Sequence, residues 1–240
     1  MIEQLKASDP NDGHFYDVYQ TEPPAQRKTI YFIGPYTGRL LYFKILISRL
    51  VLRGYRILYL QPHTEVLNTQ RPKNLEQSIT EAYGIISRDL AQLTNKEQSY
   101  LLGISLGSYL GLNVLADLPI RKFIVVAGGV PLGNVFRTSS LFLLQRRKLK
   151  KQNHSYETVE REWLRFDKAF KSQDLKEKDV LALNSKTDGL IKAKHLTIFM
   201  NELSKAGAKV QSIRSGRLPH FVQALSANFR IRQIDKFFKS

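Results

Sequence analysis

Cysteine is absent from this chain of 240 residues, which excludes disulfides, thiolate metal sites and cysteine nucleophiles. Long hydrophobic runs are missing too. Lys44, Arg49 and Arg53 interrupt the most apolar stretch, residues 40–54, and a membrane-spanning helix needs about 18 apolar residues. The first ten residues have no apolar stretch after a basic one, so no secretory signal is expected. We therefore expect a cytoplasmic protein without a transmembrane segment.

Acidic residues are scarce, with 21 Asp and Glu against 37 Lys and Arg and a net charge of +16. The excess is uneven, because residues 133–178 carry 12 basic against 6 acidic residues and residues 192–240 carry 10 against 2. A basic surface attracts phosphates, anionic lipid or acidic proteins, and an ordinary solvated surface is the alternative. No nucleic-acid recognition motif accompanies the charge, so nucleic-acid binding is not expected.

Short β-rich runs alternate with helical stretches along most of the chain. The expected strands cover residues 15–19, 29–33, 55–60, 99–104, 122–127, 180–184 and 209–213. The expected helices cover residues 39–53, 74–93, 107–117, 192–206 and 221–238. Strands that alternate with helices predict an α/β fold, with a mostly parallel central sheet and helices on both faces.

Residues 133–178 break this alternation and predict a helical insertion in the α/β domain. Residues 146–151 carry five positive charges and no acid, so they would either attract phosphate, anionic lipid or a carrier protein, or form an exposed helix face. Trp163, Phe166 and Phe170 recur at spacings of three and four, which predicts a helix docked on a core.

The segment Gly103-Ile-Ser105-Leu-Gly107 follows one expected strand and precedes a helix. This is the G-x-S-x-G pattern in the context that a catalytic serine requires, where a tight turn exposes the hydroxyl at a helix N-terminus. A glycine-rich turn with a capping serine is the structural alternative. The pattern predicts Ser105 as a nucleophile.

A serine hydroxyl needs a base to take its proton, and His220 is the favoured one. It follows the strand at 209–213 and precedes the last helix, which places it over the carboxyl edge of the sheet, near Ser105. The other histidines are His14 in a polar loop, His63 at a strand end within reach of the site, His154 in the insertion and His195 in a helix.

The imidazole in turn needs a carboxylate to fix its tautomer. Asp188 follows the strand at 180–184 and is expected at the same sheet edge. An ordinary Asp-Gly turn without a catalytic role is the alternative interpretation. Asp179 precedes that strand, at the wrong edge, and Asp174 is a weaker competitor in the insertion.

The order serine, aspartate, histidine, each after a successive strand, resembles the α/β-hydrolase superfamily over residues 28–132 and 179–240. The resemblance implies the triad Ser105, Asp188 and His220. It also implies a core of residues 1–132 and 179–240 with a cap or lid at 133–178. Small esterases, lipases and acyl-aminoacyl peptidases are the most similar members, and no single subfamily stands out.

The oxyanion hole is where the chain departs from the superfamily pattern. One donor is expected to be the backbone N–H of Leu106, and the second is expected in the loop after the strand at 29–33. In one register the second donor falls on Pro35, which has no N–H. In the other register it falls on Gly34, which we prefer, with Tyr36 as the fallback.

These residues predict a serine hydrolase that cleaves an ester-like acyl bond of a small-molecule substrate, without a cofactor. Carboxylic ester, thioester and amide substrates all fit, and an acyltransferase would use the same triad. A catalytically weak or inactive binding protein on this fold is the alternative. No His, Asp or Glu cluster has ligand spacing, so no metal is expected. The oligomeric state is open.

Overall fold

The strands form one sheet in the order β1-β2-β4-β3-β5-β6-β7-β8. They are β1 (Ile2–Lys6), β2 (Tyr16–Thr21), β3 (Lys28–Ile33), β4 (Tyr55–Pro62), β5 (Ser99–Ile104), β6 (Lys122–Val126), β7 (Asp179–Ser185) and β8 (Lys209–Ser215). The pairs β1–β2 and β2–β4 are antiparallel, and the remaining pairs are parallel. The computed structural model describes residues 2–7, 9–21, 28–93, 98–128, 132–139, 142–151, 156–172, 175–191 and 193–240.

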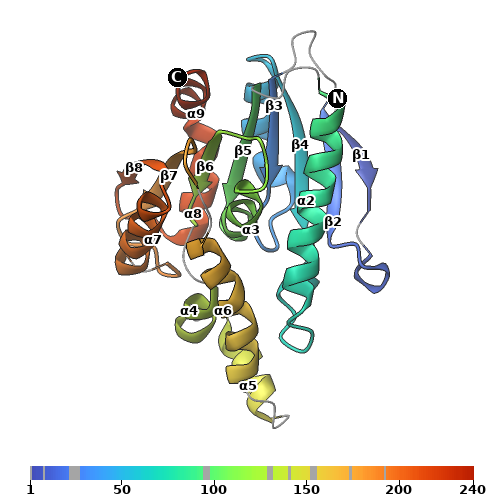
Figure 1. Ribbon diagram of the computed structural model, residues 1–240, viewed down its shortest axis with the longest axis vertical. Helices are drawn as coiled ribbons and strands as arrows, with labels where there is room; N and C mark the ends of the chain where they lie inside the picture. Colours follow the sequence, from blue (N-terminus) through green and yellow to red (C-terminus); the bar gives the residue numbers. More distant parts are fainter. Residues whose placement is uncertain are drawn as a thin grey trace.

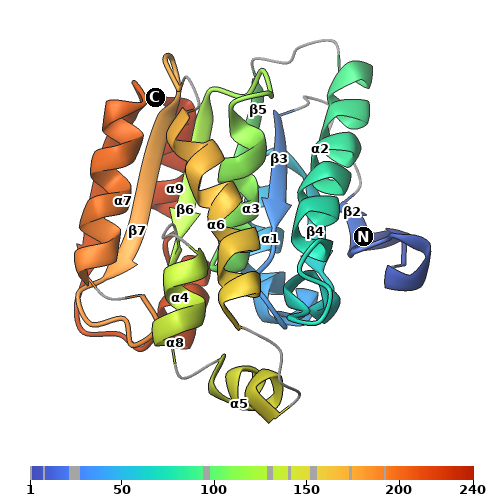
Figure 2. The ribbon, with the colours of Figure 1, turned by 60° about the horizontal axis from the view of Figure 1, so that its bottom comes forward.

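Helices cover both faces of this sheet. The α-helices are α1 (Lys44–Val51), α2 (Asn74–Gln92), α3 (Leu106–Leu115), α4 (Leu132–Thr138), α5 (Leu143–Lys151), α6 (Tyr156–Ser172), α7 (Ala193–Lys205), α8 (His220–Leu225) and α9 (Ile231–Lys239). The 3₁₀ turns are η1 (Pro10–Asp12), η2 (Leu40–Phe43), η3 (Thr64–Leu67) and η6 (Ser226–Phe229). Figures 1 and 2 show α2 and α3 in front of the sheet and α1 and α9 behind it. The predicted α/β architecture is therefore confirmed.

Side chains of the central strands enter two separate cores. On β3, Tyr31 and Ile33 pack into the core that includes α2 and α3, whereas Ile30 and Phe32 pack into the core that includes α1 and α9. This alternation arises because successive strand residues point to opposite faces. A strand that is buried on both faces has to be apolar at nearly every position. The central strands therefore appear in the sequence as continuous apolar runs.

The two ends of the chain differ from the prediction. Strand β1 was not predicted, because three of its five side chains are exposed and no apolar pattern marks it. The helix predicted at 221–238 is broken into α8, η6 and α9. Within η6, the Asn228 side chain accepts the Leu46 N–H at 3.0 Å and donates to the Tyr42 carbonyl at 2.9 Å. These bonds anchor the break to α1 and η2.

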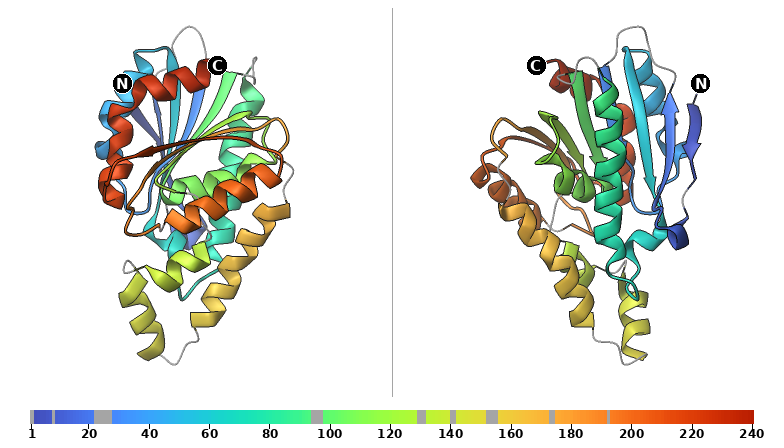
Figure 3. Two further views of the ribbon diagram at one scale, coloured as in Figure 1. Left: turned by 90° about the vertical axis from the view of Figure 1, so that its left-hand side faces the viewer. Right: turned by 45° about the vertical axis from the view of Figure 1, so that its right-hand side comes forward.

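Helices α4, α5 and α6 hold most of residues 133–178 and lie toward the carboxyl edge of the sheet. Figure 2 shows the parallel strands pointing toward α4 and α8, with α5 farther out. In Figure 3, α4, α5 and α6 extend as an arm beyond the sheet. The division into a core and an insertion stays a prediction.

Aromatic packing fixes α6 against its neighbours. The Trp163 ring lies 5.1 Å from the Phe136 ring and 6.0 Å from the Phe142 ring, measured between centroids. Trp163 is fully buried, and Phe166 packs against the same core. The stripe predicted to dock a helix does so at these two positions, whereas the side chain of Phe170 lies outside the described residues.

Candidate active site

Ser105 occupies the turn between β5 and α3. Its backbone has φ 53° and ψ −115°, a conformation that is strained for any residue other than glycine. The Ser105 N–H donates to the Val126 carbonyl at 2.8 Å, so β6 holds the turn in place. The fold therefore presents this serine at the carboxyl end of a central strand.

Crowding explains the glycine on each side of this serine. A Cβ atom on Gly103 would lie 2.6 Å from the Ser108 Cα, and a Cβ atom on Gly107 would overlap the carbonyl oxygen of Ile33. Backbone atoms cannot move aside as a flexible side chain can. Glycine at both positions therefore allows α3 to begin this close to β3 and β5.

Ser105, His220 and Asp188 form one hydrogen-bonded chain. The His220 Nε2 lies 2.8 Å from the Ser105 Oγ, and the His220 Nδ1 lies 2.7 Å from the Asp188 Oδ2. The residues follow β5, β8 and β7, whose carboxyl ends meet at one sheet edge because these strands are parallel. An Nδ1–H donated to Asp188 leaves Nε2 free to accept the serine proton.

Backbone amides hold the Asp188 carboxylate in its orientation. Its Oδ1 accepts the Leu190 N–H at 2.9 Å and the Ile191 N–H at 3.0 Å, so Oδ2 faces His220. The Asp188 side chain is 5% exposed and that of His220 is 14% exposed. The acid and the imidazole are thus screened from most of the solvent, while the histidine still reaches the pocket.

Ser185, at the end of β7, joins the aspartate loop to the histidine loop. Its hydroxyl accepts the Thr187 N–H at 3.2 Å and the Leu218 N–H at 2.9 Å, and it donates to the Gly216 carbonyl at 3.0 Å. This residue was not predicted from the sequence. No motif marks it, because its partners lie on two loops that only the β7–β8 pairing brings together.

The other histidines and aspartates that were considered as base or acid do not join this hydrogen-bonded chain in the described residues. The His63 Nδ1 accepts the Glu65 N–H at 3.2 Å and caps η3. His14 contacts Lys6 and Glu81. His154, Asp174 and the side chain of His195 lie outside the described residues, and Asp179 begins β7 at the opposite edge.

The loop after β3 contains the residues expected to supply the second oxyanion donor. The Gly34 N–H donates to the Leu60 carbonyl at 2.9 Å and extends the β3–β4 ladder, so this amide is already engaged. Pro35 has no N–H. Tyr36 is the next residue with an amide, and it lines both pockets that contain Ser105. Leu106 is the first residue of α3, where helix amides lack intrahelical partners.

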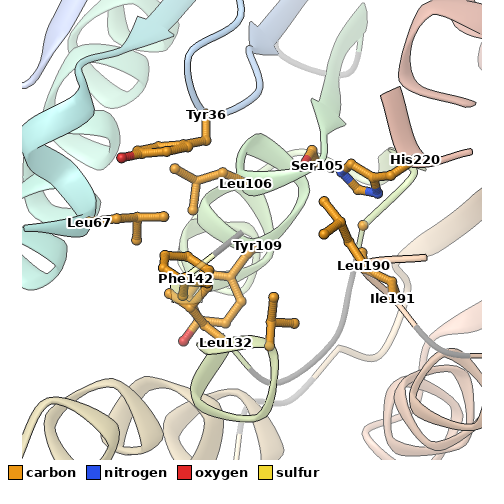
Figure 4. Close-up of a pocket in the computed structure, with 12 residues that line it drawn as sticks. Tyr36, Leu67, Ser105, Leu106, Tyr109, Leu132, Phe142, Leu190, Ile191 and His220 are labelled. Carbon is orange, nitrogen blue, oxygen red and sulfur yellow. Dashed lines mark hydrogen bonds between the residues drawn. The ribbon is translucent and has the colours of Figure 1, made fainter. Parts of the chain in front are cut away.

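Two pockets meet at the Ser105–His220 pair. The first is an apolar cavity of about 50 Å³. Figure 4 shows its lining side chains, which include Leu67 and Leu106 from the core, Leu132 and Phe142 from the region of α4 and α5, and Leu190 and Ile191 from the aspartate loop. The second, of about 170 Å³, also borders Ser105 and His220 and is lined by Tyr42 and Phe221 among others. Ser105 and His220 therefore border two spaces of different size.

Tyr36 lines both pockets and carries a hydroxyl group with a raised pKa. Burial raises the pKa of its hydroxyl, and the nearby Glu65 carboxylate raises that pKa further. The hydroxyl therefore stays protonated at neutral pH and can act as a hydrogen-bond donor near the pocket.

The described residues favour neither a metal centre nor a membrane span. Within this part of the chain, no group of three His, Asp or Glu residues is arranged to hold a metal ion. None of the helices described is long and apolar enough to cross a membrane.

The sheet order, the helices on both faces and the serine turn together define the α/β-hydrolase fold, and comparison with solved structures agrees. The mouse alpha/beta hydrolase domain-containing protein 10 matches with a TM-score of 0.65 and 12% identity, over 100% of this chain and 98% of that one. An esterase from Pyrococcus furiosus matches with a TM-score of 0.64 and 14% identity, over 100% and 92%.

The acylaminoacyl peptidase of Pyrococcus horikoshii matches with a TM-score of 0.69 and 17% identity. The match covers 99% of this chain but only 41% of that protein, so this chain spans less than half of the peptidase. No protein-family model and no curated protein matches the sequence. At these identities the likeness establishes the fold.

Proposed function

We propose that this protein is a serine hydrolase that cleaves an ester-like acyl bond through an acyl-enzyme on Ser105. The observation that carries the proposal is the relay of hydrogen bonds, 2.8 Å from Ser105 to His220 and 2.7 Å from His220 to Asp188. The neighbours named as an esterase and as a peptidase in the structural comparison support the same class of reaction.

The reaction begins when the His220 Nε2 takes the proton from the Ser105 hydroxyl as its oxygen attacks the substrate carbonyl carbon. The carbonyl oxygen becomes an oxyanion, which the Leu106 N–H stabilises together with a donor from Tyr36. His220 then protonates the leaving group as the acyl–heteroatom bond breaks. Water, deprotonated by His220, releases the acid and restores Ser105.

The two pockets suggest where the parts of the substrate bind. The apolar cavity of about 50 Å³ suits a short acyl group. The larger pocket beside Tyr42 and Phe221 suits the leaving group. Thioester, ester and amide substrates all satisfy this geometry.

Labelling with a fluorophosphonate probe tests the proposal. Wild-type protein is expected to label, because an activated serine displaces fluoride from the probe and becomes phosphonylated, whereas Ser105→Ala is expected not to label. The exposed serine of α1 supplies the matched control, and Ser48→Ala should label like wild type. The kcat/KM for short-chain esters should fall at least about 1,000-fold in Ser105→Ala.

A binding protein without catalysis is the second candidate, and the loop after β3 favours it. With the Gly34 N–H engaged by the Leu60 carbonyl and no N–H at Pro35, the oxyanion has fewer donors in reach. Loss of one donor typically costs roughly 2.7–4 kcal/mol of barrier. Folded wild-type protein that stays unlabelled would support the binding role and contradict the hydrolase.

A further inference from the structure

Large apolar side chains stand in solvent on the α1 side of the sheet. Leu52 is 83% exposed, Phe229 is 75% exposed and Leu41 is 64% exposed. The docking face, as we call this surface, comprises Leu41, Tyr42, Ile45, Leu52, Phe221, Val222 and Phe229. Such a gathering of exposed apolar side chains marks an interaction site.

Contacts join the segments of the docking face into one surface. The Tyr42 and Phe221 rings lie 6.0 Å apart, edge to face. Asn228, beside Phe229, bonds to the backbone of both η2 and α1. A surface groove of about 710 Å³ is lined by Arg49 of α1 together with Phe229 and Arg230.

Helix α1 and the residue after it, Leu52, carry apolar side chains in solvent as well as in the core. Its inward side chains, Leu46, Ile47 and Leu50, are buried in the core. Ile45 and Leu52 lie seven residues apart, and therefore on one side of the helix, and both face solvent. A helix that packs only on its own core needs one apolar stripe. Ile45 and Leu52 are therefore available to a partner outside this chain.

The charge around the docking face has one sign. Residues 39–53 and 213–234 contain eight Lys and Arg and no Asp or Glu. Arg49 and Arg232, which line the groove, are exposed. Among the described residues, no ion pair joins Arg49, Arg230 or Arg232 to a carboxylate. Asp235, next along the chain, is paired with Arg53 and Lys239.

We propose that the docking face binds the surface of an anionic phospholipid bilayer. Apolar side chains surrounded by basic residues are complementary to such a surface. The apolar side chains insert into the acyl region of the bilayer, and the basic side chains bind the phosphate headgroups. A second copy of this chain is disfavoured, since a symmetric interface would place this basic surface against itself. The groove beside Arg49, Arg230 and Arg232 seats headgroup phosphates.

This position places the active site at the membrane. Tyr42 and Phe221 belong to the docking face and also line the pocket that contains Ser105 and His220. A bound bilayer therefore covers the mouth of the leaving-group pocket. The binding itself does not depend on the proposed function, because no step of it uses the serine.

Cosedimentation with vesicles tests the docking face. The full chain is mixed with vesicles of phosphatidylcholine alone or with 30% phosphatidylglycerol. Wild type is expected to bind the anionic vesicles only, and to be released by high salt. Ile45→Ser with Phe229→Ser should weaken binding at least about 10-fold. Arg49→Gln with Arg232→Gln should weaken it about 25-fold, since each cation near such a surface contributes about fivefold.

The matched control lies on α5, the other basic surface. Leu144→Ser with Lys148→Gln and Lys150→Gln removes exposed groups of the same kinds and should leave binding unchanged. Circular dichroism verifies that each variant is folded, and Ser105→Ala should bind vesicles like wild type whether or not the protein labels. Three results would each overturn the proposal. The wild-type protein could fail to bind anionic vesicles, or the α5 variant could lose binding as the docking-face variants do. The wild-type protein could also form a dimer that only the docking-face substitutions dissociate.

Discussion

At the scale of single residues, the relay depends on groups that hold the acid and the base rather than on the triad alone. Asp188 is oriented by the amides of Leu190 and Ile191. The Ser185 hydroxyl holds the aspartate loop and the histidine loop at once. A displacement of about 1 Å in such a site can cost about 100-fold in rate. Ser185 is therefore a positioning residue for the proposed reaction.

Replacing Ser185 with alanine should lower kcat about 10- to 100-fold and leave KM within about twofold, because the substrate pockets keep their lining. Steady-state kinetics with a short-chain ester measures kcat and KM separately. Ser212→Ala, on the exposed side of β8, is the control and should behave as wild type. A rise in KM with kcat unchanged would contradict the positioning role.

At the scale of elements, the turn between β5 and α3 is where sequence and packing are most closely coupled. Both glycines of the turn stand against backbone atoms. Gly84, in the middle of α2, is surrounded by open space, and a Cβ atom added there would meet nothing within 4 Å. The same substitution at the two kinds of glycine should therefore have opposite effects on stability.

Gly107→Ala should lower the free energy of unfolding by at least about 2 kcal/mol, since the new methyl group overlaps the Ile33 carbonyl. Gly84→Ala should raise it by roughly 0.5–1 kcal/mol, because alanine favours the helix. Urea unfolding followed by circular dichroism measures both changes. Equal effects of the two substitutions would show that crowding in the serine turn is not what requires glycine.

At the scale of the whole molecule, tyrosines carry much of the two cores. Tyr16, Tyr31, Tyr55 and Tyr59 are fully buried or nearly so. Burial is the largest cause that raises the pKa of each hydroxyl above its ordinary value of 10.0. Lys178 is the opposite case, because burial lowers the pKa of its ammonium group.

These shifts predict unfolding in alkali. The folded state keeps its phenol protons above pH 10 while the unfolded state loses them, so stability is present below pH 10 and falls as the pH rises beyond it. Lys178 acts in the other direction, but the tyrosines with a raised pKa outnumber it. The free energy of unfolding, measured in urea at pH 8, 9.5 and 11, should be lowest at pH 11.

Tyr59→Phe provides the control for this alkaline loss. Within the described residues, the buried Tyr59 hydroxyl has no hydrogen-bond partner. Its removal should raise stability at pH 8 by about 1 kcal/mol and should make the fall toward pH 11 shallower. A free energy of unfolding that is the same at all three pH values would contradict the prediction.

Local patterns along the chain are enough to predict the fold and the order of the candidate triad. Strands and helices follow from the spacing of apolar residues, and parallel strands share one carboxyl edge, so Ser105, Asp188 and His220 are expected together. Their distances are consistent with that expectation, and their catalytic role stays a prediction. The weakly patterned strand β1 was not predicted because exposed edge residues carry little apolar signal.

The tertiary structure alone decides which polar groups form hydrogen bonds with distant parts of the chain. The Gly34 N–H is engaged by the Leu60 carbonyl, and no local pattern in the sequence indicates that bond. Asn228, at the break in the last helix, bonds to η2 and α1. The docking face likewise exists only because η6 and α1 are side by side. Local sequence predicts where a polar or apolar group lies along the chain, whereas its partner depends on which remote segment packs against it.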